Sequence, residues 1–186
     1  MTKIKANDVF PSFTFSTAMK DCLDTQDVCR GRKTVFWVLR YIGCTVCRYD
    51  VQLLSERYQE FTDRGAQVFV VMQSDRKHVL DDLAATDTVL PFEIITDPEQ
   101  QIYRLLSIEP ASSMEALAEG VMEQLREKAR QARLRGFSHG DYEGNEQQLP
   151  ALFIVDPGMV TRVAHYAQNI MDMPSIDEVL AMLDTF

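Results

Sequence analysis

The chain has 186 residues, of which 46% are hydrophobic, and a formal net charge of −9. A chain of this length can bury one core of ordinary size, so we expect a single domain over residues 1–186. The acidic surface repels phosphate backbones and anionic lipid, which argues against binding of nucleic acid or membranes. The N-terminus lacks the apolar stretch of a secretory signal, and no apolar run approaches the ~18 residues that span a bilayer, so we expect a cytoplasmic protein.

The first half of the chain alternates buried strands with helices. Residues 34–39 form a continuous apolar run, which is typical of a strand buried on both faces of a sheet. A helical stripe of apolar side chains then recurs at intervals of three and four: Cys47, Val51, Leu54, Tyr58 and Phe61. We expect this helix to end near Gly65, and a second buried strand to follow at residues 67–72.

The middle of the chain continues the same alternation. Ser74 or Asp75 can cap a helix that runs to about residue 85, and residues 92–96 are predicted to form a strand. Pro98 is expected at the first position of a short helix that ends near residue 106, because proline is tolerated there.

The end of the chain predicts a hairpin and a closing helix. Residues 152–155 and 160–166 are strand-like and flank a turn signal at 156–158. Ser175 is placed to cap a helix over residues 176–183. Helices alternating with buried strands, followed by a hairpin, indicate an α/β fold with a central mixed β-sheet flanked by helices.

Residues 111–148 interrupt this rhythm. An apolar stripe of helical spacing runs toward Arg135: Met114, Leu117, Val121, Leu125 and Ala129. A polar loop with several glycines follows at residues 136–145. We interpret the segment as a helical insertion that packs on the domain and can shape access to a site.

Cys44 and Cys47 form a C-x-x-C pair where the first buried strand passes into a helix. Unpaired N–H groups and the dipole of a helix N-terminus favour a thiolate, which lowers the pKa of the first cysteine. The three-residue spacing brings Cys47 to the same helix face, where it can attack a mixed disulfide. Gly43 is expected to leave Cys44 unshielded. The pattern predicts a redox pair in which Cys44 attacks and Cys47 resolves.

Zinc binding is the main alternative for this pair. A structural zinc site needs four ligands, usually from two closely spaced pairs. The only other cysteines, Cys22 and Cys29, have an irregular spacing, and no pair of histidines lies nearby. We expect these two to be free thiols in a hairpin segment, with a second redox pair as the alternative.

Three segments of the chain match a known family pattern: Asn7-Asp-Val-Phe-Pro-Ser-Phe-Thr-Phe15, Arg40-Tyr-Ile-Gly-Cys-Thr-Val-Cys-Arg48 and Leu152-Phe-Ile-Val-Asp-Pro-Gly158. Through them the chain from residue 7 onward resembles the AhpC/TSA family, in its peroxiredoxin-like branch of the thioredoxin-like superfamily. The resemblance implies a thioredoxin-like fold with an N-terminal extension and a helical insertion before a strand led by a cis Pro150. It also implies that Pro150 faces the Cys44 sulfur and holds a substrate strand beside it.

The sequence also departs from the motifs of the families that it resembles. Peroxidases of the superfamily carry Thr or Ser three residues before the reactive cysteine, a proline four residues earlier, and an arginine near the late strand. Here Tyr41, Trp37 and Pro150 hold those positions, and residues 34–39 lack the buried carboxylate of thioredoxin. Arg40, Arg48 and Arg162 match no motif. We therefore rank a thiol–disulfide oxidoreductase first, a thiol-dependent peroxidase second and a non-catalytic zinc-binding or structural module third.

Four residues are candidates for substrate binding: Gly43, Tyr41, Arg48 and Pro150. Arg48 could pair with a thiolate or form a surface salt bridge, and Trp37 and Tyr41 are expected to pack around the motif. His139 is either a base at the site or a loop residue without a role.

The expected partners follow from the redox pair. The substrate would be a protein or small-molecule disulfide or a peroxide, and a thioredoxin or glutathione system would supply the external thiol reductant. We expect no cofactor and no metal, and a homodimer is left open.

Overall fold

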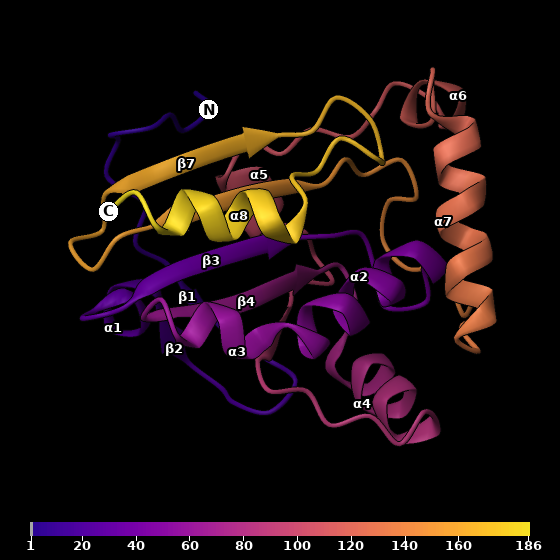
Figure 1. Ribbon diagram of the computed structural model, residues 1–186, viewed down its shortest axis with the longest axis horizontal. Helices are drawn as coiled ribbons and strands as arrows, with labels where there is room; N and C mark the ends of the chain where they lie inside the picture. Colours follow the sequence, from indigo (N-terminus) through magenta and orange to yellow (C-terminus); the bar gives the residue numbers. More distant parts are fainter. Residues whose placement is uncertain (1) are drawn as a thin grey trace.

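The computed structural model describes residues 2–186, and its centre is a five-stranded mixed sheet in the order β5–β4–β3–β6–β7 (Figure 1). Strands β3, β4 and β5 run parallel, whereas β6 runs antiparallel to β3 and to β7. A separate small sheet pairs β1 (Thr14–Phe15) with β2 (Leu23–Asp24). The five central strands are β3 (Lys33–Val38), β4 (Ala66–Met72), β5 (Glu93–Thr96), β6 (Ala151–Val155) and β7 (Thr161–Tyr166).

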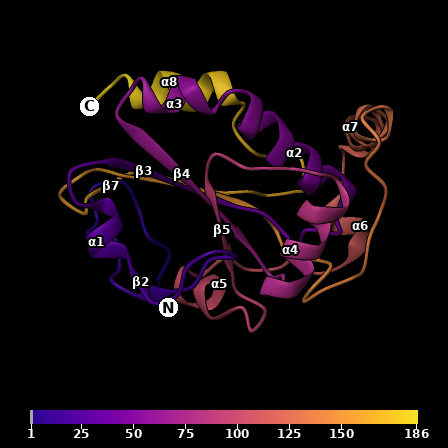
Figure 2. The same ribbon diagram turned by 90° about the horizontal axis from the view of Figure 1, so that it is seen from below.

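Helices cover both faces of the sheet (Figure 2). One face carries α2 (Thr45–Glu56), α3 (Tyr58–Thr62), α4 (Arg76–Ala85) and α8 (Ile176–Leu183). The other face carries α1 (Thr25–Cys29) and α5 (Gln101–Leu105). Within residues 2–186, no helix is both long enough and apolar enough to cross a membrane.

Strand β3 divides the core in two because side chains alternate along a strand. Val35 and Trp37 pack into the cluster under α2 and α8, and Phe36 and Val38 pack into the cluster under α1 and α5. All four side chains are buried, which explains why the sequence shows no alternation of polar and apolar residues here. The predicted α/β fold with a central mixed sheet is confirmed.

Two helices differ from their predicted form. The helix expected to run past Phe61 divides into α2 and α3 at Arg57, whose φ of −111° and ψ of 10° lie outside the helical region. Phe61 remains fully buried after the break, so the apolar stripe alone did not reveal it. Pro98 does not start α5, because residues 98–100 form a turn in which Gln100 is left-handed, and the side chain of Asp97 caps the helix instead.

The segment between α5 and β6 contains two helices, α6 (Met114–Leu117) and α7 (Met122–Leu134), where one was expected. The break contains Gly120, whose φ of +71° no helix accommodates. Helix α7 packs against α2 and stands across the end of the sheet toward which β3 and β4 point (Figure 1).

The predicted cis bond at Pro150 is wrong. Among residues 2–186 every peptide bond is trans, including the one before Pro150. The trans form of a prolyl bond is the more stable by about 0.5–1 kcal/mol, so a cis bond persists only where tertiary contacts select it. Here Pro150 leads directly into β6, and its oxygen accepts the N–H of Ala167 over 3.2 Å.

The closing helix α8 offers a direct test of local sequence signals. Ser175 and Glu178 form a complete capping box, in which each side chain accepts the backbone N–H of the other. Replacing Ser175 with alanine should lower the free energy of unfolding by about 1 kcal/mol, because the N–H of Glu178 loses its partner. Urea denaturation checks this, with Ser12→Ala on the exposed surface as control; equal midpoints for the two variants would contradict the capping role.

Candidate active site

Cys44 lies where the central strand gives way to a helix. Strand β3 ends at Val38, and after a turn Cys44 is the N-cap residue of α2, with its Sγ atom 3.4 Å from the backbone nitrogen of Cys47. A helix N-terminus presents unpaired N–H groups and a positive dipole end, and both stabilise a thiolate. Cys44 is only 1% exposed, so this stabilisation comes from the protein and not from bulk water.

The second partner of the Cys44 sulfur is the guanidinium of Arg40. Its Nη2 atom donates to Sγ of Cys44 over 3.1 Å, and its Nη1 atom donates to the backbone oxygen of Glu146 over 2.5 Å. Arg40 is itself buried, so water screens its charge only weakly. The sequence indicated Arg40 only as a neighbour of the motif, and the structure brings it into contact with the sulfur.

The two cysteines differ in acidity. Burial opposes ionisation of Cys44, but hydrogen bonds from Cys47 and the charge of Arg40 outweigh it and lower the pKa of Cys44 to about 6. Burial raises the pKa of Cys47 well above its ordinary value, and the adjacent Cys44 sulfur raises it further. The difference fits Cys44 as the attacking sulfur and Cys47 as the resolving one, and these roles remain predictions.

Tyr41 and His139 meet beside the motif. The Tyr41 hydroxyl lies 3.2 Å from Nε2 of His139, and Nδ1 of His139 lies 2.7 Å from the backbone oxygen of Gly140. In a neutral ring, Nδ1 must carry the proton to donate to that oxygen, and Nε2 then accepts from Tyr41. His139 therefore lies at the site, and Tyr41 packs there as expected.

A loop of residues 136–146, the covering loop, lies over the motif. The N–H of Gly140 donates to the Gly43 oxygen over 2.8 Å, and a Cβ atom on Gly43 would overlap the backbone oxygen of Asp141. Gly43 therefore permits close approach of two backbones. The expectation that it leaves Cys44 unshielded is wrong.

Glu143 fixes the covering loop to the start of α4. It accepts the hydroxyl proton of Ser74 over 2.6 Å and the N–H of Asp75 over 3.2 Å, and its Oε1 lies 2.6 Å from Nδ1 of His78. The hydrogen bond and negative charge of Glu143 raise the pKa of His78. The loop is thus held by several contacts across the site.

Arg48 directs its side chain away from the cysteines. It is 2% exposed, and its Nε atom donates to Asp82 over 2.5 Å while Nη2 donates to Thr86 and Thr88. These acceptors lie on α4 and just after it, so Arg48 ties α2 to α4. A role for Arg48 in substrate binding is not supported by these contacts. Of the two pairings that the sequence left open, a thiolate or a surface salt bridge, the structure shows a salt bridge, and it is partly buried.

The other two cysteines lie apart from the motif. Cys22 is exposed, and Cys29 is buried in the core on the opposite face of the sheet, where burial raises its pKa to about 11. Both are free thiols, as expected. Residues 23–29 form β2 and α1, so the expected hairpin segment is partly helical.

A cavity of about 400 Å³ opens beside Cys44. Arg40, Thr45, Glu115 and His139 supply its polar wall, and Pro150 is not part of it. Because Cys44 is otherwise enclosed, this cavity is the route by which a small molecule would reach the sulfur. Its apolar wall comes from α6, α7 and their surroundings: Met114, Leu117, Ala118, Met122, Leu125 and Ile170.

The structure gives the zinc alternative no additional ligand. Within residues 2–186, the one group of three metal-ligating side chains close enough to share an ion is Asp75, His78 and Glu143, and neither Cys44 nor Cys47 belongs to it. Two thiolates alone fall short of the four ligands that a structural zinc site requires.

Comparison with known families gives one match. The sequence pattern of the AhpC/TSA family matches residues 6–164. A search of curated proteins found none whose sequence matches this chain.

Many solved structures share the fold, and two peroxiredoxins are among them. A cysteine-to-serine mutant of peroxiredoxin 6 from Arenicola marina is 14% identical, with a TM-score of 0.69 over 98% of this chain and 73% of that one. The mitochondrial 1-Cys peroxiredoxin of yeast, whose thiol is resolved by glutathione/thioredoxin systems, is 16% identical, with a TM-score of 0.68 over 97% of this chain and 75% of that one. At this identity the likeness establishes a thioredoxin-like fold.

Proposed function

Because this chain belongs to the AhpC/TSA family, we propose that it is a thiol-dependent peroxidase in which Cys44 reduces a hydroperoxide and Cys47 resolves the product. The observation that carries this proposal is the Cys44 sulfur, held between the N–H of Cys47 and the guanidinium of Arg40. The sequence ranked this function second, since Tyr41 and Pro150 replace residues of the peroxidase motif. Arg40 supplies the positive charge that is missing where Pro150 replaces the arginine of the motif.

The first step is an attack of the Cys44 thiolate on the terminal oxygen of the hydroperoxide. The O–O bond breaks, the sulfur is oxidised to sulfenic acid, and the other oxygen leaves as an alcohol or water after taking up a proton. Arg40 keeps the sulfur ionised before the attack and offsets negative charge on the oxygens during it. His139 lines the cavity and is joined to the Tyr41 hydroxyl, so this pair can supply the proton that the departing oxygen takes up.

The enclosure of Cys44 favours a small oxidant over a protein disulfide. A protein disulfide would have to reach a sulfur that is 1% exposed beneath the covering loop, and the trans Pro150 does not line the entrance. A hydroperoxide fits the cavity without any such movement. Thiol–disulfide exchange is the second candidate, because the C-x-x-C pair at a helix N-terminus suits it as well.

In the second step Cys47 attacks the sulfenic sulfur of Cys44, which releases water and leaves a disulfide. An external thiol then attacks the disulfide and restores both cysteines. A thioredoxin or glutathione system is the reductant we propose for this step. Glutathione is small enough to enter through the cavity, whereas a thioredoxin requires the covering loop to move.

The test is the rate at which Cys44 reacts with hydrogen peroxide and with an organic hydroperoxide, followed by the fluorescence of Trp37, the chain's single tryptophan. At pH 7 the lowered pKa makes the thiolate fraction of Cys44 about 30-fold that of free cysteine, which is only a few per cent ionised there. We expect the ratio of the rates to exceed this figure, because Arg40 also stabilises the transition state. A rate no faster than that of free cysteine would leave thiol–disulfide exchange as the function.

A further inference from the structure

The proposed peroxidase mechanism needs a group that accepts the proton of the Cys47 thiol. Cys47 must ionise before it can attack Cys44, yet it is 3% exposed and its thiol is hard to ionise there. The groups that act on it from the surrounding elements are Cys44, Arg40, Tyr41, Tyr103 and Lys128. None is a ready base. The cations are protonated, the Tyr41 and Tyr103 hydroxyls are engaged with His139 and with the Leu39 oxygen, and Cys44 carries the oxidised sulfur.

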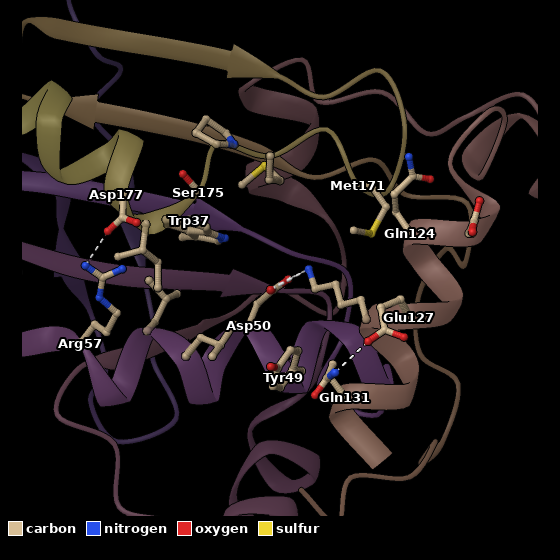
Figure 3. A pocket seen from close by; sticks show the side chains of 17 residues that line it. Trp37, Tyr49, Asp50, Arg57, Gln124, Glu127, Gln131, Met171, Ser175 and Asp177 are labelled. Atoms are coloured by element: carbon tan, nitrogen blue, oxygen red, sulfur yellow. Dashed lines mark hydrogen bonds and ion pairs between the residues drawn. The ribbon is translucent and has the colours of Figure 1, made fainter. Parts of the chain in front are cut away.

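A buried carboxylate lies one helical turn beyond Cys47. Asp50 follows at the i+3 position of α2, where side chains share a face and their Cβ atoms lie about 5–6 Å apart. Lys128 reaches it from α7, with Nζ 2.7 Å from Oδ1 and 2.8 Å from Oδ2 (Figure 3). Both side chains are less than one-fifth exposed. Burial raises the pKa of Asp50, and the charge of Lys128 opposes that rise.

The ion pair borders a cavity of about 790 Å³ between α2, α7 and the start of α8 (Figure 3). Trp37 lines the same cavity, with its indole nitrogen turned toward Asp50. Trp37 is 4% exposed, and its Nε1 atom has no hydrogen-bond partner in the described chain. A buried N–H of this kind is normally satisfied by ordered water, and such water could also carry a proton to or from Asp50.

We propose that Asp50, held by Lys128, exchanges the proton of Cys47 through water while the disulfide forms. This inference rests on the proposed peroxidase. The Cys47 proton passes to the Asp50 carboxylate, and the new thiolate attacks the Cys44 sulfenic sulfur. The S–O bond breaks as the S–S bond forms, and the departing hydroxide takes the proton back from Asp50 and leaves as water. During reduction, Asp50 would supply the proton that Cys47 regains.

Asp50→Asn tests this step, because it keeps the side chain's shape and removes its basicity. The protein is mixed with one equivalent of hydrogen peroxide, quenched, and analysed by mass for sulfenic acid and disulfide at each time. We expect the peroxide phase to keep its rate and disulfide formation to slow on the order of 100-fold at pH 7. The remaining rate should rise about tenfold per pH unit, because only direct ionisation of Cys47 then supplies the thiolate.

Lys128 gives an independent arm of the test. Removing its charge in Lys128→Met should raise the pKa of Asp50 further and move the pH profile of disulfide formation to higher pH, and Lys128→Arg should restore the profile. Asp177→Asn is the control, since it also breaks an ion pair to α2, at Arg57, the residue that ends the helix ten positions after Cys47. It should leave the profile unchanged.

The outcomes separate this inference from the peroxidase itself. A wild-type protein without a fast peroxide phase contradicts the proposed function. A normal peroxide phase, combined with wild-type rates and pH profiles of disulfide formation in Asp50→Asn, overturns the role of Asp50 alone. If Asp50→Asn does not fold, an unshifted profile in Lys128→Met overturns the inference in its place.

Discussion

Replacing Cys44 with serine should abolish hydroperoxide consumption, with a loss of at least about 1,000-fold. A serine hydroxyl stays protonated near neutral pH, and its oxygen cannot be oxidised to a sulfenic acid. The loss should appear both in steady-state turnover with an external thiol reductant and in the first turnover without one. Cys22→Ser is the control, because Cys22 is exposed and lies away from the motif, and it should retain wild-type rates.

Replacing Cys47 with serine should stop the reaction at a later step than Cys44→Ser does. In this variant Cys44 should consume one equivalent of hydroperoxide at close to the wild-type rate, because Arg40 and the helix N-terminus still hold the thiolate and the serine hydroxyl can donate in place of the Cys47 thiol. The sulfenic acid should then persist, and added thiol should capture it as a mixed disulfide detectable by mass. Equal capture by Cys44→Ser and Cys47→Ser would contradict the assigned order of the two sulfurs.

The elements that the sequence predicted well are those whose signals are local. The apolar run at residues 34–39 needs both sheet faces covered, and the observed β3 has this environment. Ser175 and the apolar stripe after it specify both the start and the face of α8. The breaks at Arg57 and Gly120 were missed because a stripe of helical spacing records which side chains are buried and carries no information about the direction of the chain.

The residues of the site also divide into those with a local sequence signal and those without one. Cys44 and Cys47 are three residues apart on one helix, so their proximity follows from spacing alone. His139 meets Tyr41 across 98 residues, and nothing in a glycine-rich loop specifies where that loop docks. Arg40 did leave a signal, because it is a single charge directly after a buried run and four residues before Cys44. A charge in such a position needs a buried partner, and here the partner is the sulfur.

The prediction of a cis bond at Pro150 was wrong for a different reason. It came from the family resemblance and had no support in the local sequence, since X–Pro dipeptides of either isomer look alike. In this chain an arginine from the turn after β3 makes the contact to Cys44, and the segment that leads into β6 does not line the cavity. Family likeness therefore predicted the scaffold better than it predicted the groups around the sulfur.

Replacing Arg40 with methionine should reduce the rate of peroxide reaction at pH 7 by up to about 1,000-fold. The guanidinium supplies a charge and a hydrogen bond that offset burial, so the pKa of Cys44 should rise from about 6 toward its ordinary value of 9.0, while the hydrogen bonds from Cys47 remain. A full return to 9.0 lowers the thiolate fraction at pH 7 about 100-fold, and the lost charge-assisted hydrogen bond removes about a further tenfold of transition-state stabilisation.

The pH dependence gives the sharper test of Arg40. In the wild type the rate should rise as pH increases through about 6 and then level off, because the thiolate is the reactive form. In Arg40→Met the rise should continue toward pH 9, and ultraviolet absorbance of the thiolate should titrate in parallel. Arg40→Lys keeps the charge without the fork that joins Cys44 to Glu146, so an intermediate pKa is expected. Arg162→Met is the control, because it removes a partly exposed arginine that pairs with Asp156, and it should titrate as the wild type does. If the profile of Arg40→Met also overlays that of the wild type, the helix N-terminus alone ionises Cys44.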